Sequence, residues 1–165
     1  MARVRQPTHD ESLLMPALRV IIPGTPIPAA RPRVTRYGTY IPKRQKEYME
    51  IVRSSLAAAM RSEGCEIARR GTRVGLTVFV GIPWPTKARK GDADTAVPLT
   101  ARPDADNFLK MVMDGGNQIC WEDDSQIWSL ACEKWRVPRG TERLEVEALW
   151  QIEQEDVIDN NVQLA

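Results

Sequence analysis

Aspartates and a lysine in two short segments are the residues of this sequence best suited to chemistry. Asp104 and Asp106 are separated by one residue, so in extended chain their carboxylates point to the same side. Lys110 stands one helical turn beyond Asp106, on the same face of the helix expected there. Asp123 and Asp124 follow on a short return before the next strand. Carboxylates beside an ammonium group favour a hard divalent cation and the hydrolysis of a phosphate ester.

The helix that carries Lys110 is expected to begin beside these carboxylates, because Asp106 or Asn107 can cap its first turn. An apolar run supplies its inward face, namely Phe108, Leu109, Met111 and Val112. The helix is predicted to stop at Gly115-Gly116, since a glycine pair suits a C-terminal cap. This helix would therefore hold the first two carboxylates and the lysine on one short element.

Three interpretations of the acidic residues compete. Most single aspartates before helices are caps or turn residues, but clustered carboxylates repel one another unless something neutralises them. A calcium or magnesium site without chemistry is a second interpretation, although the EF-hand spacing is missing. The third is Mg²⁺-dependent phosphodiester hydrolysis, with Lys110 stabilising the phosphate or orienting the attacking water. Adjacent side chains of an extended chain face opposite ways, so only one of Asp123 and Asp124 can point inward.

The composition indicates a soluble protein of one domain from a reducing compartment. Its 165 residues with 42% hydrophobic content allow one proper core and are short for two. No apolar run approaches the ~20 residues needed to span a bilayer, and no apolar segment of a secretory signal follows the first arginines. The 3 cysteines lack a CxxC pattern and there is 1 histidine, which argues against a zinc site. We therefore expect a cytoplasmic protein without a membrane partner.

Charge is unevenly distributed along the chain, although the net charge is only +1. Basic residues prevail over residues 31–53 and acidic residues prevail from Glu142 onward. The separation predicts a basic face for a polyanion, while ordinary solvated charge explains the composition equally well. The proline-rich segment 24–33 cannot be helical and is expected to hold out Arg31 and Arg33 toward flanking phosphates.

Hydrophobic periodicity predicts an α+β fold in the order β-α-β-α-β-β, a single domain with a mixed β-sheet packed by two helices. We expect strands at 18–22, 73–82, 127–137 and 143–151 and a first helix at 43–62. The first helix would bury Tyr48, Val52, Leu56 and Met60, with Ile51 and Ala59 widening that stripe and Lys46, Glu50 and Arg53 outside. The last two strands are expected to form an antiparallel hairpin. The strand at 127–137 would carry Trp128, Leu130 and Cys132 along one side, and Trp128 and Trp150 are expected in the core.

The remaining segments are predicted to be connections. A turn or small hairpin is expected at 37–40. Residues 86–101 form a polar loop that contains a second acidic pair, Asp92 and Asp94. No helix or suitably spaced lysine follows that pair, so we interpret it as flexible loop. The domain is expected to span residues 18–152, between a flexible arm at 1–17 and a tail at 153–165.

Taken together, these segments resemble the RusA family of Holliday-junction resolvases. The resemblance runs from about Leu18 to Trp150 and is carried by Gly24-Thr25-Pro26, Arg31-Pro32-Arg33, Arg102 to Lys110, Asp114, and Trp121 to Ile127. The pattern P-D-x-D-N-x-x-K joined to a later D-D-S-Q is specific, whereas a lone DxD is not. Arg102 stands where a lysine is common, and the stretch from Gly115 to Gln118 departs from the usual apolar helix end.

The resemblance implies a small homodimeric endonuclease that cuts four-way DNA junctions with paired symmetric nicks. The reaction would depend on Mg²⁺, with Mn²⁺ as a substitute. By matching position the catalytic residues would be Asp104, Asp106, Asp124 and Lys110, the three aspartates also binding the metal and Asp123 acting as an accessory acid. The basic residues expected to contact branched DNA are Arg31, Arg33, Arg36, Lys43, Lys87, Arg102 and Lys134. Family members are bacterial and often encoded by phages or prophages.

Two other functions stay open on the residues alone. A branched-DNA-binding module would hold metal without turnover, and a flap or replication-fork nuclease would use the same chemistry on another substrate. The approximate two-fold symmetry of a four-way junction favours a two-fold dimer with two equivalent sites.

Overall fold

The strand β4 (Val74–Pro83) lies at the centre of a five-stranded mixed sheet with the order β1-β7-β4-β6-β5. The computed structural model describes residues 18–30, 33–36, 38–88 and 91–150. β4 pairs in parallel with β6 (Ile127–Val137) and antiparallel with β7 (Arg143–Trp150). β1 (Leu18–Pro23) joins the far edge of β7, and β5 (Val97–Pro98) joins β6. The predicted α+β architecture is confirmed.

The predicted hairpin between the last two strands is wrong, because β4 separates β6 from β7. The turn after Val137 crosses over β4 instead of folding β7 back onto its predecessor. β4 buries Val74, Leu76, Val78 and Val80 on one face. Alternation of this kind shows which face of a strand is buried and does not show which strand lies beside it.

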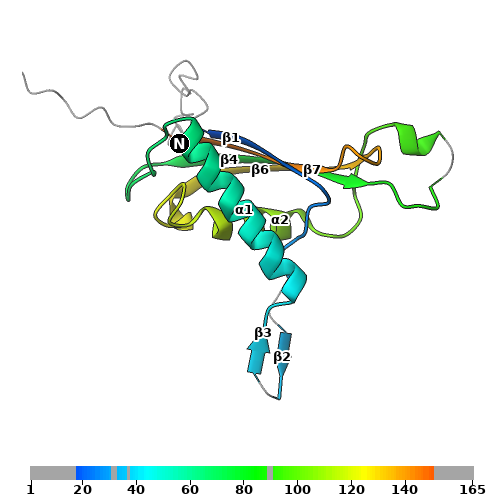
Figure 1. Cartoon of the computed structure of the whole chain (residues 1–165), viewed down its shortest axis with the longest axis horizontal. Coiled ribbons are helices and arrows are strands. Elements are labelled where there is room, and N and C mark those ends of the chain that lie inside the picture. The colour runs from blue at the N-terminus through cyan, green and yellow to red at the C-terminus, as the bar shows by residue number, and fades with distance from the viewer. Residues whose placement is uncertain (1–17, 31–32, 37, 89–90, 151–165) are drawn as a thin grey trace, which may run out of the picture.

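Two helices cover the same face of the sheet (Figure 1). α1 (Lys43–Ser62) has the predicted bounds and buries the predicted stripe of Tyr48, Val52, Leu56 and Met60. Ile51 does not widen the stripe as predicted, since it is 47% exposed, and Met49 packs against the core instead. α2 (Ala105–Gly116) lies against α1 and β6.

Two predictions about the ends of α2 are corrected. The N-cap is Asp104, with no side-chain capping hydrogen bond, rather than Asp106 or Asn107. Gly115 and Gly116 lie inside the helix and are buried, so they do not form a C-terminal cap. Their role is close packing, because a Cβ at Gly116 would lie 2.6 Å from Cε2 of the buried Trp121.

Arg53 of α1 does not point outward as predicted. Its guanidinium donates hydrogen bonds to the carbonyl oxygens of Gly115 (3.3 Å) and Asn117 (3.4 Å). The last carbonyls of a helix have no partner within the helix, and a cation is also favourable at that end. Arg53 therefore fastens the end of α2 to α1.

Trp150 is buried as predicted, but Trp128 and Leu130 are 55% and 47% exposed. The register of β4 and β6 shifts between Val74 and Gly75, and Trp128 is the residue of β6 that this irregularity leaves without a register partner. The described part of β5 pairs only with Trp135 and Arg136, so it leaves the first part of β6 at the sheet edge. An apolar residue at such an edge has less protein to cover it.

The connecting segments are more ordered than predicted. The small hairpin at 37–40 is confirmed as β2 (Arg33–Thr35) paired with β3 (Gly38–Tyr40), which projects beyond the start of α1 (Figure 1). The polar loop predicted at 86–101 contributes β5 and a 3₁₀ turn, η2 (Asp92–Asp94), so its acidic pair lies in a turn rather than in irregular loop. The indole nitrogen of Trp84 donates to the carbonyl of Thr95 at 2.8 Å. The predicted arm and tail lie outside the described residues.

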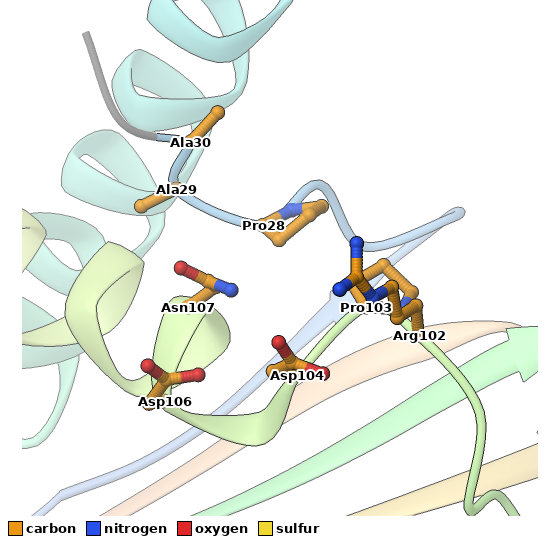
Figure 2. A pocket seen from close by; sticks show the side chains of 8 residues that line it. All are labelled: Pro28, Ala29, Ala30, Arg102, Pro103, Asp104, Asp106 and Asn107. Atoms are coloured by element: carbon orange, nitrogen blue, oxygen red, sulfur yellow. The ribbon is translucent and has the colours of Figure 1, made fainter.

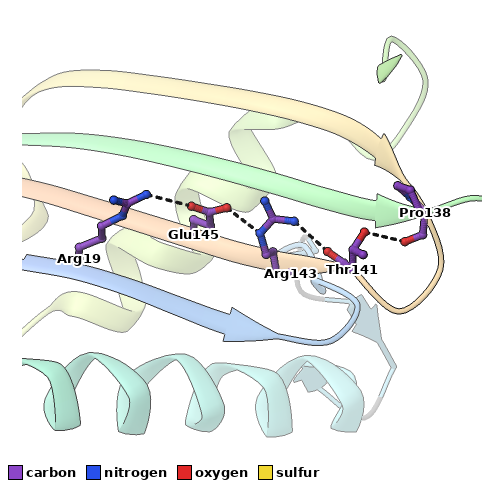
Figure 3. A network of polar contacts seen from close by, with 5 residues as sticks. All are labelled: Arg19, Pro138, Thr141, Arg143 and Glu145. Carbon is purple, nitrogen blue, oxygen red and sulfur yellow. Dashed lines mark hydrogen bonds and ion pairs between the residues drawn. The ribbon is translucent and has the colours of Figure 1, made fainter. Parts of the chain in front are cut away.

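The face of the sheet opposite the helices carries a chain of polar contacts (Figure 3). Glu145 lies between Arg19 (3.7 Å) and Arg143 (2.6 Å), and the guanidinium of Arg143 covers the ring of Phe79. Arg19 and Arg143 thus share one carboxylate on this face. Within the described ranges, none of the helices has the length and apolar character needed to cross a membrane.

Candidate active site

Asp104 and Asp106 lie together at the start of α2. Asp104 is extended (φ −74°, ψ 150°) and Asp106 occupies the first turn of the helix. Figure 2 shows both carboxylates at one pocket, with the loop from Pro28 to Ala30 across from them. The pocket has a volume of about 600 Å³ and is lined by Pro28, Ala29, Ala30, Arg102, Pro103, Asp104, Asp106 and Asn107. The structure therefore brings together the first two predicted acids.

The loop across the pocket is fixed to both helices. The amide of Ala29 donates to the carbonyl of Asn107 at 2.9 Å, and the amide of Ala30 donates to Oε1 of Gln45 at 3.0 Å. Gln45 is only 8% exposed, and the sequence analysis missed it. The available signal was a polar residue one turn before Tyr48 on the apolar stripe of α1. This attachment ends directly before Arg31, which lies outside the described residues.

Lys110 stands on the exposed side of α2, but its partner is Asp114 and not Asp106. The ammonium lies 3.1 Å from Oδ2 of Asp114, and the lysine side chain is 65% exposed. A surface pair at this spacing contributes only ~0.3–0.5 kcal/mol. Lys110 can therefore exchange this carboxylate for another anion at little cost.

Asp123 and Asp124 stand at the 3₁₀ turn η3 (Asp124–Gln126), and neither lines the pocket. The Asp123 carboxylate accepts a hydrogen bond from the amide of Ser125 (3.0 Å), while its own amide donates to the side chain of Gln126 (3.0 Å). Hydrogen bonds from the Ser125 side chain and, to a lesser extent, from its amide lower the pKa of the Asp123 carboxyl. Asp123 is thus engaged in a capping box, which leaves Asp124 as the carboxylate of this turn without a capping duty.

Across the described residues there is no group of three or more His, Cys, Asp or Glu side chains placed to hold a metal ion. The predicted gathering of Asp124 with Asp104 and Asp106 is therefore absent from this conformation. The pair alone still fits Mg²⁺, which commonly takes one or two carboxylates and completes its octahedron with waters and substrate phosphates. Neither Asp104 nor Asp106 makes an ion pair with a described residue, so their oxygens are available.

The basic residues predicted to contact DNA have different surroundings. Arg102 lines the pocket and is exposed, as are Lys87 and Arg36. Lys43 is paired with Glu47 at 3.6 Å on α1. Lys134 is half-buried, and its ammonium donates to the carbonyl oxygens of Ala101 and Pro103. The side chain of Arg33 lies outside the description.

Exposed carboxylates beside the cationic Arg102 are compatible with an enzyme that cleaves phosphodiesters. The family model of endodeoxyribonuclease RusA matches residues 23–148, which include both helices and the segments of Asp104, Asp106, Asp123 and Asp124. Comparison with curated proteins gave no match. The chain belongs to the RusA endodeoxyribonuclease family, and it is an endonuclease of the Holliday-junction-resolving kind.

Proposed function

We propose that this protein is a Mg²⁺-dependent, structure-selective endonuclease that resolves four-way junctions by paired symmetric nicks. The observation that carries the proposal is the exposed pair Asp104 and Asp106, which face a pocket and make no ion pair with a described residue. Two unneutralised carboxylates this close in sequence repel each other, so a cation between them would relieve a cost already present. Both carboxylates stand at the N-terminus of α2, where the helix dipole favours a negative charge and offsets part of this repulsion.

Asp104 and Asp106 would hold the cation, with Mn²⁺ as a substitute for Mg²⁺, and Asp124 would approach from η3 when DNA is bound. Asp123 would support Asp124 from the capping box. A bound divalent cation lowers the pKa of its water and offsets negative charge on the phosphate. Lys110 would leave Asp114 to stabilise the phosphate oxygens, because its exposed side chain is free to turn.

Arg102 would bind a phosphate next to the cleaved bond, since it lines the same pocket as the two carboxylates. Arg31 and Arg33 follow the loop that is fixed across the pocket, and they would bind further phosphates together with Arg36 and Lys43. Contacts of this kind position the nucleic acid without reading its sequence. This fits an enzyme that selects the shape of a junction.

We also propose that the active form is a homodimer, because paired nicks need two equivalent sites on opposite strands. The start of β6 supports this proposal. Trp128 and Leu130 are exposed there, and no described strand pairs with the outer edge of this part of β6. Exposed strand edges readily pair with a second chain, and two copies of one edge can pair antiparallel around a two-fold axis.

The substrate is best tested with a panel of labelled synthetic DNAs: a four-way junction, a replication fork, a flap and a linear duplex, each with and without Mg²⁺. The proposal predicts symmetric nicks in the four-way junction alone, and only with the metal. Preferred cleavage of the fork or flap would contradict the assigned substrate, and tight junction binding without nicks would indicate a binding module. We place the enzyme in the cytoplasm of a bacterial cell, where junction DNA arises. The enzyme would be encoded by a phage or prophage.

A further inference from the structure

Lys134 occupies an unusual position for a lysine. It pairs in register with the fully buried Val80 of β4, so its side chain starts on the helix-covered face of the sheet. Its ammonium donates one hydrogen bond to the carbonyl oxygen of Ala101 at 2.9 Å and another to that of Pro103 at 2.5 Å. Its own carbonyl accepts from the amide of Leu99 at 2.8 Å. One residue of β6 thus holds the chain from 99 to 103 at three points.

The segment held in this way leads directly into the acidic pair. Asp104 follows Pro103, and its side chain makes no capping hydrogen bond with α2. The direction of the Asp104 carboxylate therefore depends on the backbone in front of it rather than on the helix. Cys132 stands two residues before Lys134 on the same face of β6. Its sulfur is 3.9 Å from the carbonyl oxygen of Ala105. The strand supports the chain on both sides of Asp104.

The same contacts argue against the predicted contact of Lys134 with DNA. Hydrogen bonds from an ammonium group are about twice as strong as neutral ones, and here two of them go to carbonyls. Lys134 makes no ion pair with a carboxylate of the described chain. Its charge is thus directed at the backbone before the acidic pair, and a phosphate would have to displace both carbonyls.

We infer that Lys134 is a positioning residue that fixes residues 99–103 and thereby aims Asp104 and Asp106 at the metal. This inference rests on the proposed metal-dependent cleavage. Groups that orient metal ligands from behind typically change metal affinity or activity by about 10–100-fold when they are removed. Lys134 is placed to act in this way, through carbonyls one and three residues before the first acid.

The test compares Lys134→Met with Lys87→Met, which removes an exposed lysine expected to contact DNA. For Lys134→Met we expect junction cleavage at saturating DNA to fall about 10–100-fold and half-maximal cleavage to need more Mg²⁺. Junction affinity measured without metal, and its salt dependence, should not change. For Lys87→Met we expect weaker junction binding. The salt slope, which is the slope of log K for junction binding against log salt concentration, should be smaller in magnitude by about 0.9. Lys134→Arg, which keeps charge and donors, should recover most of the missing activity.

Two measurements do not depend on cleavage. Without metal or DNA, amide hydrogen exchange of peptides covering residues 99–107 should be faster in Lys134→Met, and titration with Mn²⁺ alone should show weaker binding. These readouts still decide the role of Lys134 if the wild-type protein cuts no junction, an outcome that would count against the proposed function only. Unchanged exchange and unchanged Mn²⁺ affinity would overturn the inference. The inference would also be overturned if Lys134→Met bound the junction more weakly, with a smaller salt slope and an unaltered Mg²⁺ requirement.

If Lys134→Met shows no cooperative thermal unfolding, the same measurements on Lys134→Gln decide the question, because glutamine keeps a donor on a shorter chain. Intermediate exchange and intermediate Mn²⁺ affinity in that variant would support the positioning role. Values equal to those of the wild type would overturn it.

Discussion

Lys110 and Asp114 form an ion pair of 3.1 Å on the exposed side of α2, one turn away from the acidic pair. If this pair is a resting position for the lysine, Lys110→Met should reduce junction cleavage by about 10²–10³-fold, the typical effect of removing one hydrogen-bond donor that stabilises charge in the transition state. Asp114→Asn should leave cleavage within severalfold of the wild type. Single-turnover rates at saturating enzyme measure both. Equal losses in the two variants would show that Asp114 is itself required.

The two acids of η3 should behave differently. Asp124→Asn is expected to lose cleavage, while Asp123→Asn should retain most of it, because the Asp123 carboxylate is engaged by the amide of Ser125. Parallel cleavage assays on the two variants measure the difference. A loss of cleavage in Asp123→Asn alone would contradict the prediction.

The capping box also has a pH dependence. The pKa of Asp123 is lowered in the folded state, chiefly by hydrogen bonds from the side chain and then the amide of Ser125, so the contribution of the carboxylate to stability is complete above its usual pKa. That contribution is lost as the pH falls through the lower folded-state value. Asp123→Ala should therefore lower the melting temperature at pH 7 and have a smaller effect near pH 3. A difference in melting temperature that is constant with pH would show that the charged form adds nothing.

Salt dependence can locate the DNA-binding face. Replacing Arg31 and Arg33 by Ala should weaken junction binding and reduce the salt slope by up to about 0.9 for each duplex phosphate that the variant no longer binds. Arg19→Ala is a matched control, because Arg19 lies on the other face of the sheet beside Glu145. Binding isotherms at several salt concentrations give the slopes. An unchanged slope in the double variant would remove this loop from the DNA-binding face.

The glycine pair of α2 gives a prediction about stability. Gly116→Ala forces a methyl group against the buried Trp121 ring, and this overpacking outweighs the gain in helix propensity, for a net loss of about 2 kcal/mol. Gly75→Ala is the control, since its added Cβ would lie 3.9 Å from its nearest neighbour, Cβ of Leu149. Chemical denaturation of both variants measures the difference. An equally stable Gly116→Ala protein would mean that Trp121 moves aside freely.

Periodicity predicted the fold well where burial is one-sided. The stripe from Tyr48 to Met60 and the alternation in β4 and β7 are direct consequences of a core on one face, so the sequence contains them. The neighbours of each strand depend on contacts distant in sequence, and this is why the position of β4 between β6 and β7 was not predicted. The exposure of Trp128 has a similar origin in a register shift.

The acidic pair could be predicted because its spacing and the helix that follows are local features. The role of Lys134 could not, since it depends on a strand reaching back across 31 residues to the carbonyl of Pro103. Sequence alone shows a lysine and cannot show whether its partner is a phosphate or the protein backbone. The same limit applies to Gln45, whose partner is an amide of the loop across the pocket.

Cleavage of an end-labelled four-way junction by the wild type and by Asp106→Asn, with and without Mg²⁺, tests the central claim most directly. Asp94→Asn, in the acidic pair of the 86–101 loop, is the control and should cut like the wild type. We predict symmetric nicks by the wild type only when Mg²⁺ is present. Asp106→Asn should show no detectable cleavage and equal or tighter junction binding, because a charge that repels phosphate is removed. Cleavage by Asp106→Asn at the wild-type rate would contradict the account.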